Sequence, residues 1–231
     1  MSVGGGLRYP GATVEEPPAF TLYGDGRVIY ATPRQVEHWT RYDLFRAQMT
    51  EEQVGALLEF ALRDAGLSGA RGYYGDVPIA DDGTTTFQIN AGGFRKIVLV
   101  YALGHSDADH PDADARAKFE SLETRLNEFE AFVSAGDVVD LGEFEPDTYL
   151  VTLDEPFHPE VTPVAWPWDD LEPAEFDRPA DSGRSAYLSA EQVKALADPV
   201  NSVPNDVIVT GPDGIDYLIR VKPLLPDEVP Y

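Results

Sequence analysis

The stretch from Thr84 to Gly104, TTTFQINAGGFRKIVLVYALG, constrains the fold of this chain more than any other. Its pattern predicts two β-strands joined by a glycine-containing turn at Asn90-Ala91-Gly92-Gly93. The second strand, Ile97-Val98-Leu99-Val100-Tyr101, has apolar residues at successive positions and therefore on both faces. A strand of this kind is typical of the middle of a sheet that is covered on both sides. We therefore expect this hairpin to lie at the centre of a sheet that the rest of the chain flanks and covers.

Two helical patterns predict elements that cover this sheet. Thr50 and Gln53 form a capping-box pattern, and apolar residues then recur every three or four positions as far as Ala65. A second pattern runs from about Asp114 to Ser134, with apolar positions alternately four and three residues apart. The residues expected in the core are Leu57, Leu58, Leu62, Phe119, Leu122, Leu126, Val98 and Val100.

Shorter patterns complete the expected fold. Residues 19–31 carry a hairpin signal around Gly24-Asp25-Gly26, residues 32–42 look irregular, and residues 43–49 read as a short strand. Residues 147–153 predict a further strand, and residues 207–222 predict a second hairpin in which apolar residues alternate. The expected fold class is α+β, with antiparallel β-hairpins and helices packed on the sheet.

The domain organisation has two open interpretations. We expect residues 1–18, rich in Gly and Pro, to be a flexible N-terminal segment and residues 19–231 to be a single α+β domain. However, residues 189–197 match residues 50–58 at five of nine positions, and a predicted hairpin follows each. This favours two strand–helix–hairpin repeats that divide the chain near residues 140–185. The other interpretation is that T/S-x-E-Q-V-x-A-L is simply a common way to begin a helix.

The charge of the chain limits its partners. It has 41 Asp and Glu against 17 Lys and Arg, a net charge of −24, which argues against nucleic acid or an anionic membrane as partner. The longest unbroken apolar run, residues 97–103, is too short to span a bilayer. There is no Cys, so disulfides and thiolate metal sites are excluded. We expect a monomer without a transmembrane segment.

A set of short motifs occurs in a fixed order along the chain: Leu22-Tyr-Gly-Asp-Gly-Arg27, Thr50-Glu-Glu-Gln-Val54, Tyr74-Gly-Asp76, Thr84-Thr-Thr-Phe87, Val100-Tyr-Ala-Leu-Gly104, Trp166-Pro-Trp168 and Pro223-Leu-Leu-Pro-Asp-Glu228. In their order and spacing, these motifs resemble uncharacterised lipoproteins of high-GC bacteria. Members of that family usually begin with a lipoprotein signal and a lipid-modified Cys, and this sequence shows neither. The resemblance implies an extracytoplasmic protein, membrane-anchored or secreted, and it implies no activity. A cytoplasmic location is the alternative.

A catalytic or metal site has one candidate region, His105-Ser-Asp107-Ala-Asp109-His110-Pro-Asp112-Ala-Asp114. Imidazoles beside carboxylates can hold a divalent cation. The other interpretation is an exposed acidic loop in which Asp112 or Asp114 caps a helix. No P-loop, G-x-S-x-G or H-E-x-x-H motif is present. We therefore expect no catalytic residue, cofactor or metal; the alternative is a hydrolase or metal-dependent enzyme assembled in three dimensions around His105 and His110.

The best candidate for partner binding is a Pro-rich, acidic region that we expect to be a long ordered loop, residues 154–184. It contains the four aromatic residues Phe157, Trp166, Trp168 and Phe176. Exposed aromatic side chains in a rigid loop are good anchors for a protein or a glycan. Alternatively, these side chains fold back and cover the sheet. The sequence thus predicts a non-catalytic, extracytoplasmic binding or interaction domain whose partner is a protein or a cell-wall glycan.

Overall fold

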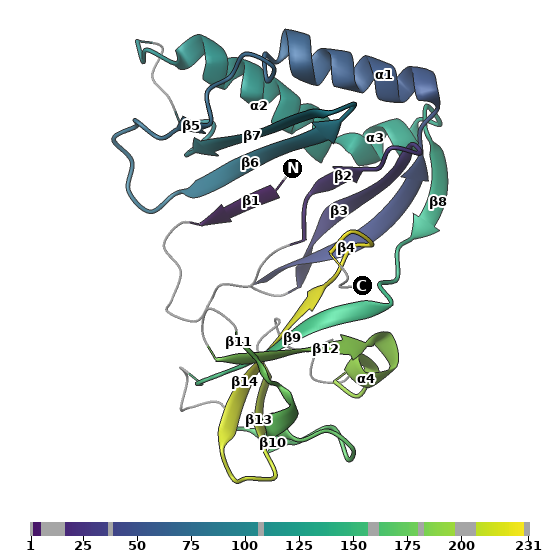
Figure 1. The fold of residues 1–231 in the computed structure, drawn as a ribbon, viewed down its shortest axis with the longest axis vertical. Coiled ribbons are helices and arrows are strands. Elements are labelled where there is room, and N and C mark those ends of the chain that lie inside the picture. The colour runs from purple at the N-terminus through teal and green to yellow at the C-terminus, as the bar shows by residue number, and fades with distance from the viewer. Residues whose placement is uncertain are drawn as a thin grey trace. The chain divides into compact units, whose positions relative to one another are not determined.

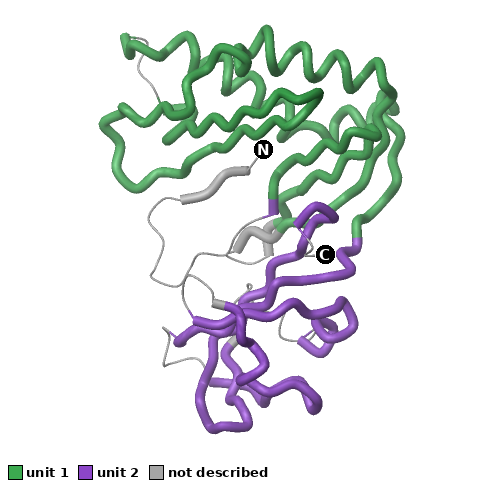
Figure 2. Tube along the Cα trace, in the orientation of Figure 1, with its two compact units in different colours: residues 1–7, 18–34, 42–144 green, residues 8–17, 35–41, 145–231 purple. Residues whose placement is uncertain are grey.

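The computed structural model describes residues 2–5, 17–36, 39–105, 109–156, 162–179, 183–196 and 207–228. Its helices and antiparallel-rich sheets confirm the predicted α+β class (Figure 1). The chain divides into two compact units, coloured separately in Figure 2. Unit 1 comprises residues 1–7, 18–34 and 42–144, and unit 2 comprises residues 8–17, 35–41 and 145–231.

The predicted central hairpin forms the middle of the first sheet of unit 1. The strands of this sheet lie in the order β1–β6–β7–β5, and their bounds are Ser2–Gly5, Gly83–Ala91, Phe94–Tyr101 and Tyr73–Tyr74 respectively. β6 and β7 are antiparallel, and the turn glycines Gly92 and Gly93 have φ of +58° and +81°, a conformation that favours glycine. β1 stands where the sequence predicts a flexible segment. This strand could not be predicted from side-chain periodicity, because it is rich in Gly and is held by backbone hydrogen bonds to β6.

Among the described elements, helices cover only one face of this hairpin, which corrects the prediction that both faces are covered. Val98 and Val100 are fully buried, whereas Ile97, one position away, is 54% exposed. The buried face carries the helices α1 (Glu51–Glu59) and α2 (Ala113–Asn127), and their side chains join Val98 and Val100 in one apolar cluster (Figure 1). Successive side chains of a strand point to opposite faces, so helices on one face leave Ile97 and its neighbours on the other.

The helices of unit 1 begin where the sequence predicts. α1, Glu51–Glu59, has the complete capping box of Thr50 and Gln53, and it continues into a π-helical turn, Phe60–Asp64. The predicted second helix is divided at Glu128 into α2, Ala113–Asn127, and α3, Phe129–Ser134. None of the described helices is long and apolar enough to cross a membrane.

Of the three leucines of this helical segment that are predicted in the core, Leu57 is buried, whereas Leu58 and Leu62 are only half-buried. We expect Leu57→Ala to lower the free energy of unfolding by about 2–5 kcal/mol, because it removes a buried leucine side chain. We expect Leu58→Ala to cost at least about 1 kcal/mol less, since part of that side chain already meets solvent. Urea unfolding of the two variants measures the difference. Equal losses would contradict this assignment of the core.

A second sheet of unit 1 has the strand order β2–β3–β4–β8. The bounds of these strands are Phe20–Leu22, Arg27–Val36, Trp39–Gln48 and Val139–Glu143. The predicted hairpin of residues 19–31 is confirmed by the pairing of β2 with β3. The expectation of irregular structure at residues 32–42 is wrong, because β3 and β4 run through most of it. Polar residues such as Arg34 interrupt the apolar alternation there, while the backbone pairing continues.

Glu123 on α2 is a half-buried carboxyl next to the first sheet. It accepts a hydrogen bond of 2.9 Å from the Thr85 hydroxyl, and burial raises its pKa above the ordinary 4.5, with Glu120 adding to the shift. A carboxyl with a raised folded-state pKa is costly to ionise, so this cost appears as pH rises above about 4.5. We expect Glu123→Gln to stabilise the protein at pH 7, by less than about 1 kcal/mol, and to have no effect at pH 3.5. Thermal melts at both pH values test this, and destabilisation at pH 7 would contradict it.

Unit 2 is built on one six-stranded sheet with the order β10–β13–β14–β9–β12–β11. These strands have the bounds Val164–Ala165, Val207–Thr210, Asp216–Pro223, Thr148–Asp154, Arg184–Ser189 and Arg178–Pro179. The predicted strand at residues 147–153 and the hairpin at residues 207–222 are both confirmed. A short helix, α4 (Ala190–Lys194), follows β12, and a 3-10 turn occupies Pro173–Glu175.

The repeat interpretation finds only a shared order of elements. Both units contain a strand, a capped helix and a hairpin in this order. In unit 1 they are β4, α1 and β6–β7; in unit 2 they are β12, α4 and β13–β14. In unit 1 the strand and the hairpin belong to different sheets, whereas in unit 2 all three strands belong to one sheet. The two arrangements are therefore not the same fold.

Candidate functional site

The acidic region after β7 uses its described side chains to hold loops together. His105 is exposed, and its Nε2 atom lies 3.6 Å from Oδ2 of Asp82. His110 contacts the carbonyl oxygen of Asp76 through Nε2 and accepts a hydrogen bond of 3.1 Å from the N–H of Asp112 at Nδ1. Both ring nitrogens of His110 therefore contact the backbone of neighbouring loops.

Asp112 occupies the predicted N-cap position of α2, but its side chain makes no capping bond, because its carboxylate pairs with Arg71. In the part of the chain that the structure describes, no group of three or more His, Cys, Asp or Glu could hold a metal ion. Asp107, His38 and His158 lie outside the described residues. Among the described residues, the acidic region thus brings the His105 imidazole near the Asp82 carboxylate, but it forms no cluster that could hold a metal ion.

The four aromatic residues predicted to anchor a partner lie in different environments. Trp168 and Phe176 are only 5% and 0% exposed, and they belong to the core of unit 2. The prediction that these two are exposed anchors is therefore wrong, and the alternative, that they cover the sheet, holds for them. Phe157 lies outside the described residues. The covered face of the sheet carries Val151, Leu153, Val209 and Ile219. Trp168 and Phe176 of the aromatic loop pack in the same apolar cluster as these residues.

Trp166 is different, because its ring is half-buried and held rigidly. It packs edge-on against Trp168 and Tyr217, with ring centroids 5.0 and 6.2 Å apart. Its indole Nε1–H donates a hydrogen bond of 2.7 Å to the carbonyl oxygen of Leu171. The polar end of the ring is thus satisfied inside the protein, and the part that meets solvent is apolar.

Strand pairing brings other apolar side chains next to Trp166. Val164 pairs with Val209, and Val209 pairs with Tyr217, so these three residues share one face of the sheet. Val164 is 42% exposed, and Ile215, two residues before Tyr217, is 54% exposed. We call the four residues Val164, Trp166, Ile215 and Tyr217 the Trp166 surface.

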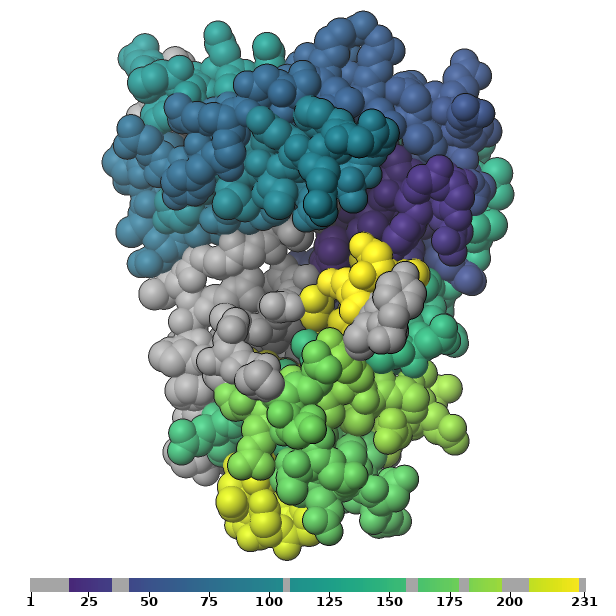
Figure 3. Space-filling view, in the orientation of Figure 1, coloured from purple at the N-terminus to yellow at the C-terminus, as the bar shows by residue number. Residues whose placement is uncertain are grey.

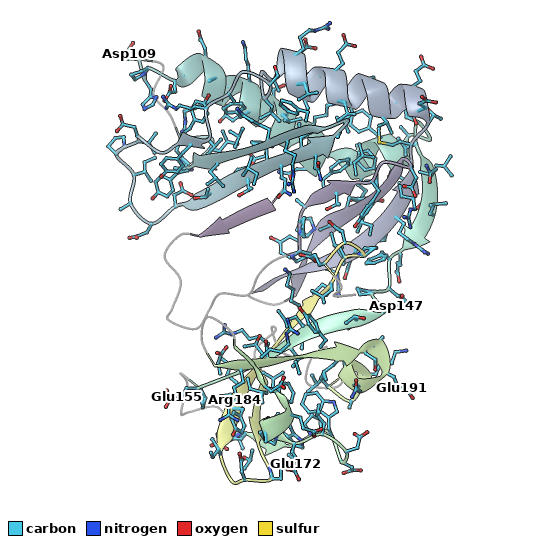
Figure 4. The ribbon with its side chains drawn as sticks, in the orientation of Figure 1. Asp109, Asp147, Glu155, Glu172, Arg184 and Glu191 are labelled. Carbon is cyan, nitrogen blue, oxygen red and sulfur yellow. The ribbon has the colours of Figure 1, made fainter. Side chains whose placement is uncertain are left out.

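Carboxylates border this surface. The Tyr217 hydroxyl donates a hydrogen bond of 2.7 Å to Oδ2 of Asp213, and this bond lowers the pKa of Asp213 below its ordinary 3.8. Burial, with the same bond adding to it, raises the pKa of Tyr217 above 10.0. Glu172, labelled in Figure 4, is exposed at the same end of unit 2. Its neighbour Pro173 packs close to Gly211 in the β13–β14 turn. Asp213 is therefore ionised at neutral pH, beside an apolar surface.

Sequence reasoning found Trp166 but missed the residues that make a surface with it. Ile215 and Tyr217 were interpreted only as alternate positions of a half-buried strand. Tyr217 comes next to Trp166 because β10 and β14 both flank β13, and this parallel pairing of β10 has no local sequence signal. Ile215 lies two residues before Tyr217, between the β13–β14 turn and β14. The only indication in the sequence is that apolar residues alternate directly after the Gly211–Gly214 turn.

No protein-family model, curated protein or solved structure matches this chain.

Proposed function

We propose that this protein is a non-catalytic, extracytoplasmic binding protein whose Trp166 surface contacts a partner that carries cationic groups. The observation that carries the proposal is a rigid, partly exposed tryptophan among exposed apolar side chains, bordered by the ionised carboxylate of Asp213. The extracytoplasmic location rests on the family resemblance of the motifs between Leu22 and Glu228. The resemblance is to lipoproteins, so anchoring at the outer face of the membrane is part of the proposal.

The fixed geometry of Trp166 favours binding. Immobilising a mobile side chain at an interface costs about 0.5–1.5 kcal/mol of conformational entropy. A side chain that is already immobilised avoids most of this cost. Trp166 is held by ring contacts and by the bond from its indole N–H to Leu171. Tryptophan and tyrosine are also the residue types that most often dominate interface energies.

The charge pattern favours a cationic partner over a neutral one. Asp169, Asp170 and Glu172 are exposed in the segment that follows Trp166, and Asp213 lies beside Tyr217. Amino or guanidinium groups on a partner would pair with these carboxylates at the rim of the interface. Rim charges of this kind mainly speed association, and their effect falls as salt is added.

The test compares partner capture by the immobilised protein and by its Trp166→Ala variant. Proteins captured from a cell-envelope extract are eluted with a salt gradient and quantified. We expect the variant to lose most of the capture and the wild-type partner to elute as the salt concentration rises. Tyr73→Ala is the matched control, because it removes an exposed aromatic side chain from unit 1 and should leave capture unchanged.

Two outcomes would go against the proposal. If Trp166→Ala melts like the wild type and captures the same material, the Trp166 surface is not the binding site. If capture depends on Trp166 but resists salt and is competed by neutral wall polysaccharide, the partner is a glycan and the cationic class is wrong.

A further inference from the structure

The face of the β6–β7 hairpin that points away from the helices carries no acidic side chain. The chain has 41 Asp and Glu, yet none lies between Asp82 and Asp107. The register of the hairpin places these residues on that outer face: Thr84, Thr86, Gln88 and Asn90 from β6, and Arg95, Ile97, Leu99 and Tyr101 from β7. Atoms in the blue to teal range that includes these strands form much of the surface of unit 1 in Figure 3. The outward-facing positions of these two strands thus carry no negative charge, although the chain as a whole is strongly acidic.

The centre of this outer face is apolar. Tyr73 on β5 pairs with Leu99, and Ile97 lies two residues from Leu99 on the same face. Tyr73 is 56% exposed and Ile97 is 54% exposed. The β6 positions around them carry hydroxyl and amide side chains. An apolar, aromatic centre from which charge is absent, with a polar rim, is the composition that distinguishes the core of a protein–protein interface.

The two ends of the outer face carry opposite charges. The Tyr101 hydroxyl donates to the carbonyl oxygen of Ile79 and accepts from the N–H of Asp82, both at 3.0 Å, which holds the acidic residues Asp81 and Asp82 at that end. Arg95 is exposed at the opposite end. It lies six residues along β7 from Tyr101, which is about 20 Å of extended strand.

We propose that this outer face is the interface of a weak homodimer, in which a second copy of the chain packs the same face against it. A two-fold axis that crosses the strands near Val98 reverses the direction of the hairpin in the second copy. Arg95 then meets the partner's Asp81 and the partner's Asp82, while Ile97 meets the partner's Leu99. The face is therefore complementary to itself, as a two-fold interface requires. This proposal departs from the expectation of a monomer.

The size of the face predicts a weak interaction. Stable interfaces use about 20–30 residues from each partner, and the outer face with Tyr73 offers far fewer. The test is sedimentation equilibrium at physiological salt. We expect the weight-average mass to rise from the 25.3 kDa of the monomer towards twice that value as concentration goes from about 10 μM to about 1 mM. A mass that stays at 25.3 kDa over this range overturns the proposal.

Ile97→Glu should abolish the rise in mass. Ile215→Glu is its matched control, because it changes the same residue type with the same 54% exposure and adds the same charge, but in unit 2. Ile215→Glu should associate like the wild type. If Ile215→Glu removes association and Ile97→Glu does not, the contact involves the Trp166 surface and the proposal for the outer face is wrong.

A charge reversal tests the direction of the two-fold pairing. Arg95→Glu should raise the dissociation constant about tenfold, because it faces two carboxylates of the partner. Adding Asp81→Lys to Arg95→Glu should restore much of the association, since each copy then offers a lysine to the partner's new carboxylate. Failure of this restoration, with all variants folded by circular dichroism, overturns the two-fold arrangement. Loss of association would leave partner capture through Trp166 unchanged, so the two proposals fail independently.

Discussion

Replacing Arg116 by Ala is expected to lower the free energy of unfolding by about 3–5 kcal/mol, which is a large fraction of the stability of a typical domain. Arg116 lies on α2 among apolar residues and is only 1% exposed. Its Nη2 atom donates hydrogen bonds of 2.6 and 2.5 Å to the carbonyl oxygens of Tyr101 and Ala102, and Nη1 donates one of 3.4 Å to that of Tyr74. The substitution removes these three hydrogen bonds and opens a cavity; of the three acceptors, the carbonyl oxygen of Ala102 keeps the N–H of His105 as a donor at 3.2 Å.

The three carbonyl groups explain why the cost is high. They come from the ends of β5 and β7, so one guanidinium group joins two strands to the helix that covers them. Ala102 also has a positive φ of 48°, which is unusual for a residue other than glycine and must be held by its surroundings. Buried acceptors that lose a donor cost about 1–3 kcal/mol each.

Chemical denaturation measures this effect, and two variants make the result specific. Lys118→Ala removes an exposed positive charge from the same helix and should change stability by less than about 0.5 kcal/mol. Arg116→Lys should remain costly, because an ammonium group cannot reproduce the planar fork of donors. A loss below 1 kcal/mol for Arg116→Ala would show that the guanidinium does not join these elements.

Trp168→Ala should destabilise unit 2 by about 3–5 kcal/mol, because it removes one of the largest buried side chains of that core. The Trp168 ring packs against Phe176 with centroids 5.9 Å apart, and its Nε1–H donates a hydrogen bond of 2.8 Å to the carbonyl oxygen of Gln192. That bond ties the aromatic loop to α4. The variant therefore loses packing and a connection between two elements.

Trp166→Ala is the informative comparison, because the two tryptophans are neighbours with different burial. We expect it to cost at least about 1 kcal/mol less than Trp168→Ala, since the Trp166 ring is half-buried. Denaturation followed by circular dichroism gives both values. If Trp166→Ala proves the more damaging change, Trp166 is a core residue and cannot serve as a partner anchor.

Local patterns in the sequence were enough to predict several elements. The capping box at Thr50 needs only two side chains three residues apart, and α1 begins there. The turn at Gly92-Gly93 needs a backbone with positive φ, and glycine provides it. The hairpin of β6 and β7 follows, because its strands are joined by that turn and need no distant partner. These predictions succeeded because the interactions that decide them lie within a few residues.

Tertiary structure alone decided which faces are covered and which residues meet. Ile97 and Val98 are equally apolar, yet one is exposed and the other buried, because helices distant in sequence pack on one face only. Trp166 and Trp168 differ in the same way. Tyr217 reaches Trp166 through the pairing of β10 with β13 across more than forty residues of sequence. Burial depends on contacts with elements from the whole chain. A local sequence pattern gives only the apolar character of a residue and not the elements that pack against it.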